Sequence, residues 1–348
     1  MHVSRLTNLC LNEHQTDIPF AVKSMITNKC LEQPWHKYPT NDVGTRTLLG
    51  RYYGVDPDAV LIGPGSFPLI DLAIRCIGRQ HVVAADPSFE EYQNCTIRCG
   101  KTFIPWRLKL DFSFDWNFID EVPSGSLIII CSPNNPTGSM AETRALKRIL
   151  SRRSDCYFLI DEAYADFCEQ SFLQLVTQYQ NIIVSRSFSK SHGLAGVRAG
   201  FLAAAPNLIE KLKSHVTPFW VHPLVCPTIE VLVGDSQIAD FFDLKRSRLQ
   251  ALRKKQCDTI NSLGSHIKAI NCPANFYLLK ANTRGEIETV RRQLAHERIL
   301  VKGFRSDSPL SCHLRLSVAE EGTHRKIIQI IKSCGSRHIA LTWCGVSS

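Results

Sequence analysis

The sequence predicts an α/β protein: a large three-layer domain built on a mostly parallel sheet, with a smaller α+β domain after it. The first observation is a set of five short apolar runs, rich in β-branched residues, between residues 60 and 205. Helix-length segments separate the runs, which is typical of buried parallel strands covered by helices on both faces. The runs are residues 82–85, 127–131, 158–160, 182–184 and 201–204.

The second observation is a change of pattern after about residue 235. The segment 241–263 is charged and has apolar residues at helical spacing, which predicts a helix leading into another domain. We therefore expect an N-terminal segment at 1–30 that packs with the small domain, a large domain at 31–232 and a small domain at 233–348. In the small domain the expected strands are 275–279, 299–301 and 313–318, and the expected helices are 286–296 and 323–332.

Bulk composition excludes several classes of protein. The 348 residues are 44% hydrophobic and 21% charged, as in a globular protein, and no apolar run has the roughly 18 residues of a membrane span. The first residues lack the apolar core of a signal peptide, so we expect a cytoplasmic protein without a membrane partner. The 14 cysteines are scattered without a CxxC pair, which favours reduced thiols and no metal site.

The net charge of +9 raises the question of nucleic-acid binding. The lysines and arginines are spread along the chain, and their densest runs lack interleaved aromatic residues. This pattern favours a solvated basic surface over a nucleic-acid site. The excess charge would also attract anionic substrates.

Polar loops follow two neighbouring predicted strands. The loop SPNNPTG at 132–138 offers two amide side chains, although alone it could equally be a tight turn. Asp161 and Tyr164 follow the next strand; an acid there is often a helix N-cap, but it can also hold a heterocyclic nitrogen protonated. Because ligands bind beyond the carboxyl ends of parallel strands, we expect these side chains to lie near one another.

A third polar loop, SRSFSKSHGLAGVRAG at 185–200, also follows a strand. Ser187, Ser189 and Arg198 surround Lys190 in the sequence, and hydroxyls with a guanidinium suit a phosphate. A lysine among such groups can serve as a nucleophile. Taken alone, the loop would be a serine-rich turn with a surface lysine, but the three loops together favour a cofactor site.

The combination of SPNNPTG, DEAY and SFSK, followed by LAGVRAGF, resembles the fold-type-I, pyridoxal-phosphate-dependent aminotransferase family of class I/II. The resemblance covers nearly the whole chain and is strongest to histidinol-phosphate aminotransferases and threonine-phosphate decarboxylases. It implies the aspartate-aminotransferase fold and pyridoxal 5′-phosphate, held by Lys190 as a Schiff base. It further implies that Lys190 moves the substrate proton, that Asp161 pairs with the pyridinium nitrogen, and that Asn135 and Tyr164 bind the cofactor's phenolic oxygen.

The resemblance assigns the cofactor's phosphate to donors from two turns, namely Gly65, Ser66, Ser187, Ser189 and Arg198. Gly65 and Ser66 precede a helix expected at 67–77, whose first N–H groups favour an anion. This turn departs from the family in having Pro64 and, after Ser66, Phe67 and Pro68, where Asn and acidic residues are commoner. Its backbone amides are therefore assigned more firmly than its side chains.

Further positions are implied by the same resemblance. Phe89 matches the aromatic residue that stacks on the pyridine ring. Tyr38 matches a tyrosine that reaches the cofactor phosphate of the other subunit, which implies a homodimer. Arg315, in HLRLSV, matches an arginine that binds a substrate carboxylate or phosphate, although an arginine on an edge strand is more often solvated. Lys302 lies near the position at which phosphate-specific relatives have a second arginine, and is a departure from that pattern. Asn135 is also expected to contact the substrate.

The reaction is harder to derive than the fold. We favour transamination of a small amino substrate, an amino acid or amino phosphate ester, because the start Asn12-Glu13 and Tyr164 resemble the histidinol-phosphate branch. Decarboxylation remains the alternative, since the orientation of the substrate selects which bond breaks, and specialised biosynthetic enzymes share the scaffold. One rival hypothesis is a protein that binds the cofactor without turnover, but such a protein would not need Lys190, Asp161, Tyr164 and Arg198 together. Another rival is nucleic-acid binding, which only the net charge suggests.

Overall fold

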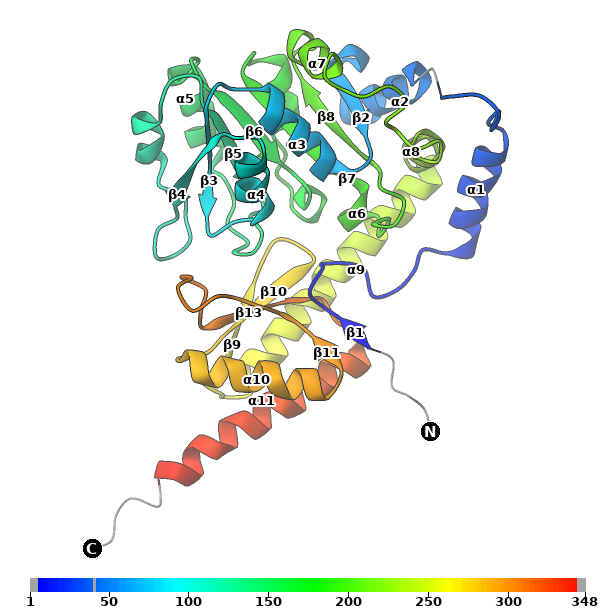
Figure 1. The fold of residues 1–348 in the computed structure, drawn as a ribbon. Helices are drawn as coiled ribbons and strands as arrows, with labels where there is room; N and C mark the ends of the chain where they lie inside the picture. The colour runs from blue at the N-terminus through cyan, green and yellow to red at the C-terminus, as the bar shows by residue number, and fades with distance from the viewer. Residues whose placement is uncertain (1–5, 40–41, 343–348) are drawn as a thin grey trace, which may run out of the picture. The chain divides into compact units, whose positions relative to one another are not determined.

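The computed structural model of the protein describes residues 6–39 and 42–342, which form two compact units (Figure 1). The larger unit runs from Asp17 to Arg246. The smaller unit consists of the described residues up to Thr16 and those from Ser247 onward. Residues 17–30 and 233–246 thus belong to the larger unit, whereas the sequence-based division had assigned both segments to the side of the small domain.

A seven-stranded sheet forms the centre of the larger unit. Neighbouring strands run parallel except for β8, which is antiparallel to both of its neighbours. The order across the sheet is β2 (Val60–Gly63), β8 (Gly200–Ala204), β7 (Ile182–Ser187), β6 (Tyr157–Asp161), β5 (Leu127–Cys131), β3 (His81–Asp86) and β4 (Thr102–Arg107). The prediction of a mostly parallel sheet is confirmed.

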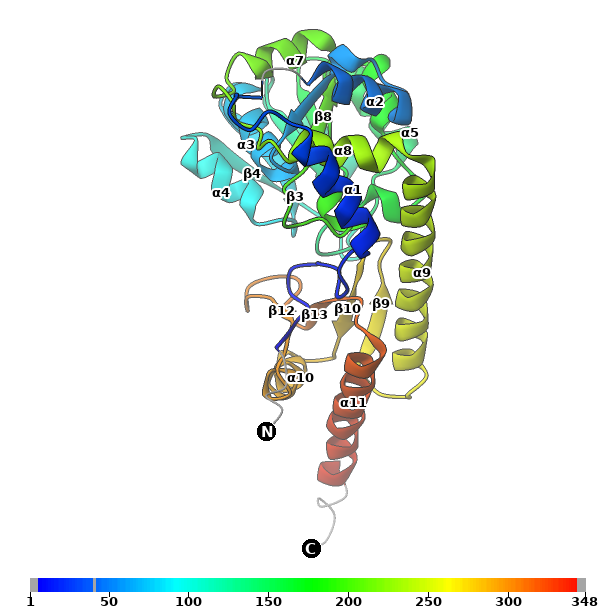
Figure 2. The same ribbon diagram turned by 90° about the vertical axis from the view of Figure 1, so that its right-hand side faces the viewer.

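Helices cover both faces of this sheet, which gives the expected three layers (Figures 1 and 2). The side chains of β5 alternate between the two faces: Ile128 and Ile130 belong to one buried cluster, and Leu127 and Ile129 belong to the other. The first cluster includes residues of α2 (Val43–Tyr53), α5 (Thr143–Arg152) and α8 (Val225–Gly234); the second includes residues of α3 (Ser66–Cys76), α4 (Glu91–Arg98) and α7 (Pro206–Lys213).

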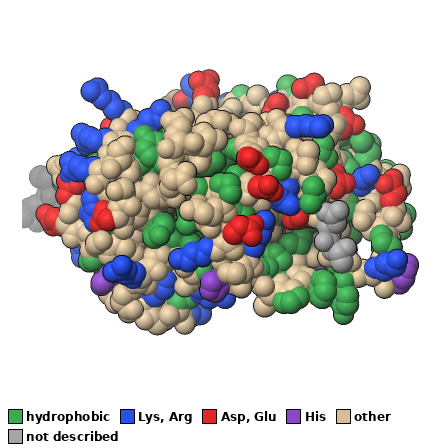
Figure 3. Space-filling model, turned by 90° about the horizontal axis from the view of Figure 1, so that it is seen from above, with side chains coloured by type: hydrophobic (Ala, Val, Ile, Leu, Met, Phe, Trp, Pro, Cys, Tyr) green, Lys and Arg blue, Asp and Glu red, His purple; other side chains and the backbone are tan. Residues whose placement is uncertain are grey.

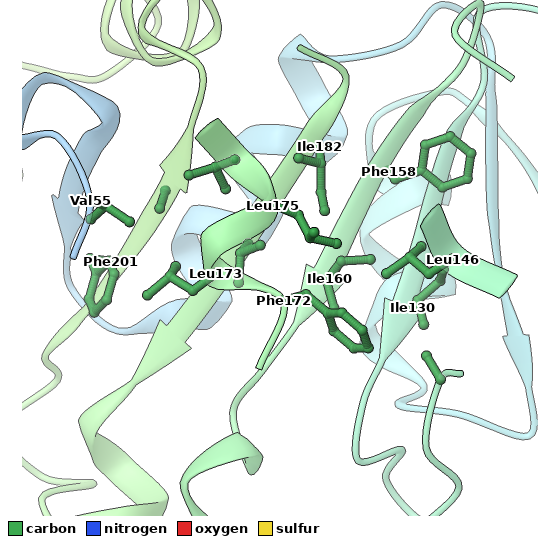
Figure 4. Packing of buried hydrophobic residues seen from close by; sticks show 14 of the residues in the cluster. Val55, Ile130, Leu146, Phe158, Ile160, Phe172, Leu173, Leu175, Ile182 and Phe201 are labelled. Atoms are coloured by element: carbon green, nitrogen blue, oxygen red, sulfur yellow. The ribbon is translucent and has the colours of Figure 1, made fainter. Parts of the chain in front are cut away.

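Figure 4 shows part of the first cluster, in which Ile130, Phe158, Ile160 and Ile182 extend from three neighbouring strands toward Leu146 of α5 and the short helical segment of Leu173 and Leu175. Every residue labelled in that view is at most 6% exposed. The helix α1 (Phe20–Leu31) precedes this layer in the sequence and contacts α8. The strands β5 and β7 are buried throughout and β6 is buried from Phe158 onward, so the polar loops that follow these three strands begin on a rigid base.

The smaller unit contains a four-stranded antiparallel sheet with the order β12 (Lys302–Gly303), β13 (His313–Ser317), β10 (Phe276–Lys280) and β9 (Lys268–Asn271). A second, two-stranded sheet pairs β1 (Thr7–Asn8) with β11 (Ile299–Leu300) in parallel. The helices α10 (Arg284–His296) and α11 (Glu321–Thr342) belong to this unit, and α9 (Ser236–Asn261) enters it from the larger one. Each predicted element is present, but α11 extends ten residues beyond the predicted end at residue 332.

On the face shown in Figure 3, basic and acidic side chains are interspersed, so the net positive charge does not gather into a continuous field there. This distribution fits the expectation of a solvated basic surface. Within the described part of the chain, the helices are all too short or too polar to span a bilayer.

Candidate active site

Three of the predicted polar loops begin at one edge of the large sheet. Adjacent strands are paired so that Cys131 lies beside Asp161, and Asp161 lies beside Ser185. The strands β5, β6 and β7 are parallel, so their carboxyl ends meet at the same edge. The structure therefore brings together the loops that carry Asn135, Tyr164 and Lys190, as the sequence predicted.

Asp161 is a buried carboxylate at the end of β6, only 5% exposed. Its Oδ1 accepts hydrogen bonds from the Ser185 hydroxyl (3.0 Å) and the Ala163 N–H (3.1 Å), and its Oδ2 accepts one from the Tyr92 hydroxyl (2.6 Å). Burial raises the pKa of Asp161, whereas these donors and the charge of Lys190 oppose the increase. The carboxyl is thus supplied with partners that favour its ionised form.

Lys190 lies in the short helix α6 (Phe188–Ser191), which follows β7 directly. The N-cap of α6 is Ser187, whose hydroxyl accepts a hydrogen bond from the N–H of Ser189 at 3.2 Å. The Lys190 side chain is partly buried, and its charge acts on Asp161. A lysine and a buried carboxyl with mutual electrostatic influence are what the predicted cofactor requires.

The predicted phosphate donors lie close together beside the start of α3 and the start of β8. Arg198 has a left-handed backbone (φ 61°), and its Nη1 donates hydrogen bonds to the Ala195 carbonyl (3.1 Å) and, weakly, to the Ser189 hydroxyl (3.5 Å). The guanidinium lies against Gly65: a Cβ added to this glycine would be 2.7 Å from Nη2, and its φ of +96° also disfavours a side chain. The Arg198 guanidinium, the Ser189 hydroxyl and the start of α3 therefore lie close together, and these groups suit a phosphate.

A close backbone approach brings the start of α3 against β8. A Cβ on Gly200 of β8 would meet the amide nitrogen of Ser66 at 2.7 Å and the carbonyl carbon of Gly65 at 2.8 Å. The strand β8 can carry only glycine at this position without displacing the start of α3. The structure thus brings together all five predicted phosphate donors.

The loop residues beside these groups are also in place. Asn135 is partly buried, and its backbone N–H interacts with the thiol of Cys131, while Tyr164 is only 4% exposed. The neighbouring Asn134 donates to the Pro87 carbonyl at 3.0 Å, which ties this loop to the one that carries Phe89. The sequence analysis gave Asn134 no separate role, and its role in the structure is to hold two loops together.

Phe89 contacts two other rings edge to face, those of Phe67 (5.8 Å between ring centres) and Tyr92 (5.5 Å). Tyr92 in turn bonds Asp161, so Phe89 and Asp161 are linked through one side chain. Sequence reasoning missed Tyr92, because 69 residues separate it from Asp161. The only available signal was its place three residues after Phe89 at the start of a helix.

A second missed feature lies on the other face of β7. Arg186, between Ser185 and Ser187, pairs with the buried carboxylate of Glu162 (2.8 Å) and the partly buried carboxylate of Asp166. Its guanidinium lies 5.1 Å from the ring centre of Tyr53. Although burial opposes its charge, Asp166 helps to raise the pKa of Arg186. This network anchors β7 and the loop that carries Tyr164.

Tyr38 lies apart from the phosphate donors in the contacts it makes. Its ring is 69% exposed and stacks on Phe219 with 4.1 Å between ring centres. Both residues line a groove of about 980 Å³ between the segments 30–42 and 213–227 of the larger unit. The proposed contact of Tyr38 with a second subunit stays a prediction.

Arg315 and Lys302 belong to the smaller unit and are paired across the strands β13 and β12. Arg315 is only 7% exposed; its guanidinium donates to the Cys10 carbonyl and lies 5.6 Å from the ring centre of Phe276. β13 is an interior strand and not an edge strand, which explains why this arginine is not solvated as edge arginines usually are. Two cations on neighbouring strands suit an anionic substrate group.

Comparison with known proteins places these observations in a family. The sequence profile of the aminotransferase class I and II family matches residues 4–332. The chain belongs to this family. A histidinol-phosphate aminotransferase of Thermococcus gammatolerans is 28% identical over 326 residues, which cover 92% of this chain and 89% of that protein.

Two solved aminotransferase structures share the fold. The histidinol-phosphate aminotransferase of Sinorhizobium meliloti, in complex with pyridoxal 5′-phosphate, superposes with a TM-score of 0.80 and 17% identity, covering 96% of this chain and 91% of that one. A double mutant of Thermus thermophilus aspartate aminotransferase gives a TM-score of 0.81 and 18% identity, covering 94% and 91%. The predictions of the aspartate-aminotransferase fold and of a pyridoxal-phosphate-dependent transferase are confirmed by these comparisons.

The residues at the sheet edge fit the cofactor that this aminotransferase family uses. Arg198 and the adjacent start of α3 offer a guanidinium and backbone amides to a phosphate. Asp161 offers a buried carboxylate to a ring nitrogen, and Lys190 offers an amine to an aldehyde. Each functional group of pyridoxal phosphate thus has a chemically suitable partner within the larger unit.

Proposed function

We propose that this protein is an aminotransferase that exchanges the amino group of a small amino acid or amino phosphate ester, similar to the histidinol-phosphate aminotransferases. The observation that carries the proposal is the grouping of Lys190, Asp161 and the phosphate donors at one sheet edge, in a chain of the aminotransferase family. A protein with net charge +9 also favours anionic substrates.

The residues have distinct proposed roles. Lys190 holds the cofactor through its amine and then takes the proton from the substrate's Cα. Asp161 keeps the ring nitrogen protonated, while Asn135 and Tyr164 donate to the phenolic oxygen. Bound pyridoxal phosphate supplies an electron-withdrawing ring that accepts the electrons released at the substrate's Cα.

The remaining residues orient the cofactor. Phe89 packs on the ring face. Gly65 and Ser66 bind the phosphate through their amides, and Ser187, Ser189 and Arg198 bind it through their side chains. These roles follow from the matched family positions and are supported by the contacts that bring the Arg198 side chain to Gly65 and Ser189.

The smaller unit supplies the proposed substrate recognition. Arg315 and Lys302 bind the carboxylate or phosphate of the substrate. The family resemblance also assigns Asn135 to the substrate. Lys302 departs from the family's second arginine: it is a point charge and lacks the bidentate geometry with which arginine binds a phosphate. We further propose a cytoplasmic homodimer in which Tyr38 reaches the cofactor phosphate of the second copy.

The test uses the full-length protein loaded with pyridoxal phosphate. Borohydride reduction followed by peptide mapping should place the pyridoxyl group on Lys190, and Lys190→Ala should abolish turnover. Amino acids and their phosphate esters, added one at a time, should convert the bound cofactor to pyridoxamine phosphate. Release of carbon dioxide with the original cofactor spectrum retained would instead establish the alternative, decarboxylation. An unmodified residue 190 would refute the proposal.

A further inference from the structure

The hydrogen bonds of Asp161 distinguish its two oxygens. Oδ1 accepts two bonds, from Ser185 and Ala163, whereas Oδ2 accepts one, from Tyr92. Each carboxylate oxygen offers two lone pairs in the plane of the group. The remaining acceptor position is therefore on Oδ2, the oxygen that Tyr92 already holds at 2.6 Å.

Tyr92 is fixed by its surroundings. Its side chain is 1% exposed, its ring contacts Phe89 edge to face, and its carbonyl accepts a bond from the Thr96 hydroxyl at 2.7 Å one turn along α4. The buried hydroxyl cannot turn toward water, so its hydrogen bond to Asp161 is already in place before a ligand binds. Ligand binding therefore costs no conformational entropy for ordering the Tyr92 side chain. Such a bond fixes both the position and the charge of its partner.

The charge of Asp161 needs this support. Burial favours the neutral acid, and a neutral acid cannot pair with a protonated nitrogen. Ser185 and Ala163 act on the other oxygen, and the help from Lys190 changes with the protonation of that amine. Tyr92 is thus the donor that acts on Oδ2 whatever the state of Lys190.

We propose that Tyr92 is a positioning residue, whose hydroxyl orients Asp161 and keeps it ionised for pairing with the ring nitrogen of pyridoxal phosphate. This inference rests on the proposed function, because only a nitrogen heterocycle requires that charge. The described titratable groups facing the pair are Cys131 on β5 and Lys190 on α6.

Tyr92 keeps its proton over the working range of pH. Burial, then the charge of Asp161 and the neighbouring Cys131, raise the pKa of Tyr92 well above its ordinary value of 10.0. Burial raises the pKa of the Cys131 thiol in the same way. The support that Asp161 receives from Tyr92 is therefore independent of pH, which an imidazole in the same place would not provide.

The experiment compares Tyr92→Phe with the parent in the full-length protein. The variant keeps the ring and removes only the hydroxyl. The matched control is Tyr277→Phe, which also removes one buried tyrosine hydroxyl, but from the core of the smaller unit, where it has no hydrogen-bond partner among the described residues. Thermal melting of all three proteins establishes that they are folded.

The readout is the dissociation constant for pyridoxal phosphate, measured by fluorescence titration between pH 5.5 and 8.5. We expect Tyr92→Phe to bind about tenfold more weakly near pH 7, as for the loss of one hydrogen bond to a charged group. Loss of the donor raises the pKa of Asp161, so the deficit should grow as the pH falls. Tyr277→Phe should bind like the parent.

A cofactor analogue separates the charge of Asp161 from packing. In 1-deazapyridoxal phosphate a C–H group replaces the ring nitrogen, so Tyr92→Phe should bind this analogue as well as the parent does. Equal losses for both ligands, or no loss for pyridoxal phosphate, would overturn the inference and leave the proposed function intact. Failure of the parent itself to bind pyridoxal phosphate would overturn both.

Tyr92→His, which retains a ring donor, should recover part of the affinity that Tyr92→Phe loses. Binding of pyridoxal phosphate no tighter than that of Tyr92→Phe would also contradict the inference.

Discussion

Replacement of Arg186 by methionine should destabilise the larger unit strongly. In the parent protein, Arg186 compensates two acids: Glu162, whose side chain is 0% exposed, and Asp166, whose side chain is 19% exposed. Methionine fills a similar volume but leaves Glu162 buried without its cation. Loss of one partner from a buried ion pair costs about 3–5 kcal/mol, so we expect a loss of this order in the free energy of unfolding at pH 8.

The dependence on pH gives this prediction its specificity. In the parent, burial acts to raise the pKa of Asp166, but the charge of Arg186 helps to lower it, and the net result is a lowered pKa. Ionised Asp166 therefore stabilises the folded protein above the ordinary pKa of 3.8, and this contribution is lost as the pH falls. Burial already raises the pKa of Glu162 in the parent, against the opposing charge of Arg186. Without Arg186, burial should raise the pKa of Glu162 further and should also raise that of Asp166. The folded variant then binds protons more readily than the unfolded chain, so its deficit should shrink as the pH is lowered from 8 to 5.

The assay is urea unfolding of the cofactor-free protein, followed by tryptophan fluorescence and circular dichroism at pH 8 and pH 5. The control is Arg75→Met, which removes a cation from a solvent-exposed pair with Asp71 and should cost less than about 1 kcal/mol at either pH. A deficit for Arg186→Met below 1 kcal/mol, or one that is the same at both pH values, would refute the reasoning.

Further predictions concern the predicted phosphate donors and the smaller unit. Gly200→Ala should weaken pyridoxal phosphate binding about a hundredfold, or about 2.7 kcal/mol, because the added Cβ would displace the Ser66 amide. The control, Gly196→Ala, has open space around the added Cβ and should bind the cofactor normally. Equal affinities of the two variants in a fluorescence titration would contradict this prediction. Burial, with help from Lys280, lowers the pKa of His313 to about 4. Folding stability should therefore fall as the pH drops from 6.5 toward 4, and His313→Gln should flatten this decline in urea titrations. Thr283→Ala breaks the capping box of α10 and should cost about 1 kcal/mol, visible as a lower urea midpoint, while an unchanged midpoint would show that the cap contributes nothing.

The fold was predictable where one physical signal dominated. Residues 127–131 are fully buried on both faces of the sheet and therefore read as an unbroken apolar run. The strand β4 was not predicted, because it lies at the edge of the sheet, exposes most of its residues and contains Pro105, which discourages a strand assignment. The strand β2 was missed because only four residues precede the Pro64-Gly65 turn.

The site was predictable to the extent that its residues follow strands. Lys190, Asp161 and Arg198 lie in loops whose sequence pattern identifies them, and parallel pairing brings these loops together. Tyr92 and Arg186 could not be found in this way. Their importance depends on which distant side chain each one meets, and neither the apolar periodicity nor the loop motifs contain that information.

The pairing of β1 with β11 has a consequence for the order in which the chain can fold. Thr7 lies beside Ile299, so β1 must wait for a partner that is synthesised much later, nearly 300 residues further along the chain. At about 5–20 residues per second this wait is roughly 15–60 s. The larger unit is continuous from Asp17 to Arg246 and can assemble on the ribosome in the meantime. The strand β1 must therefore stay unpaired for that time, and the hydrogen bond from Arg315 to the carbonyl of Cys10 can form only after β13 has been synthesised.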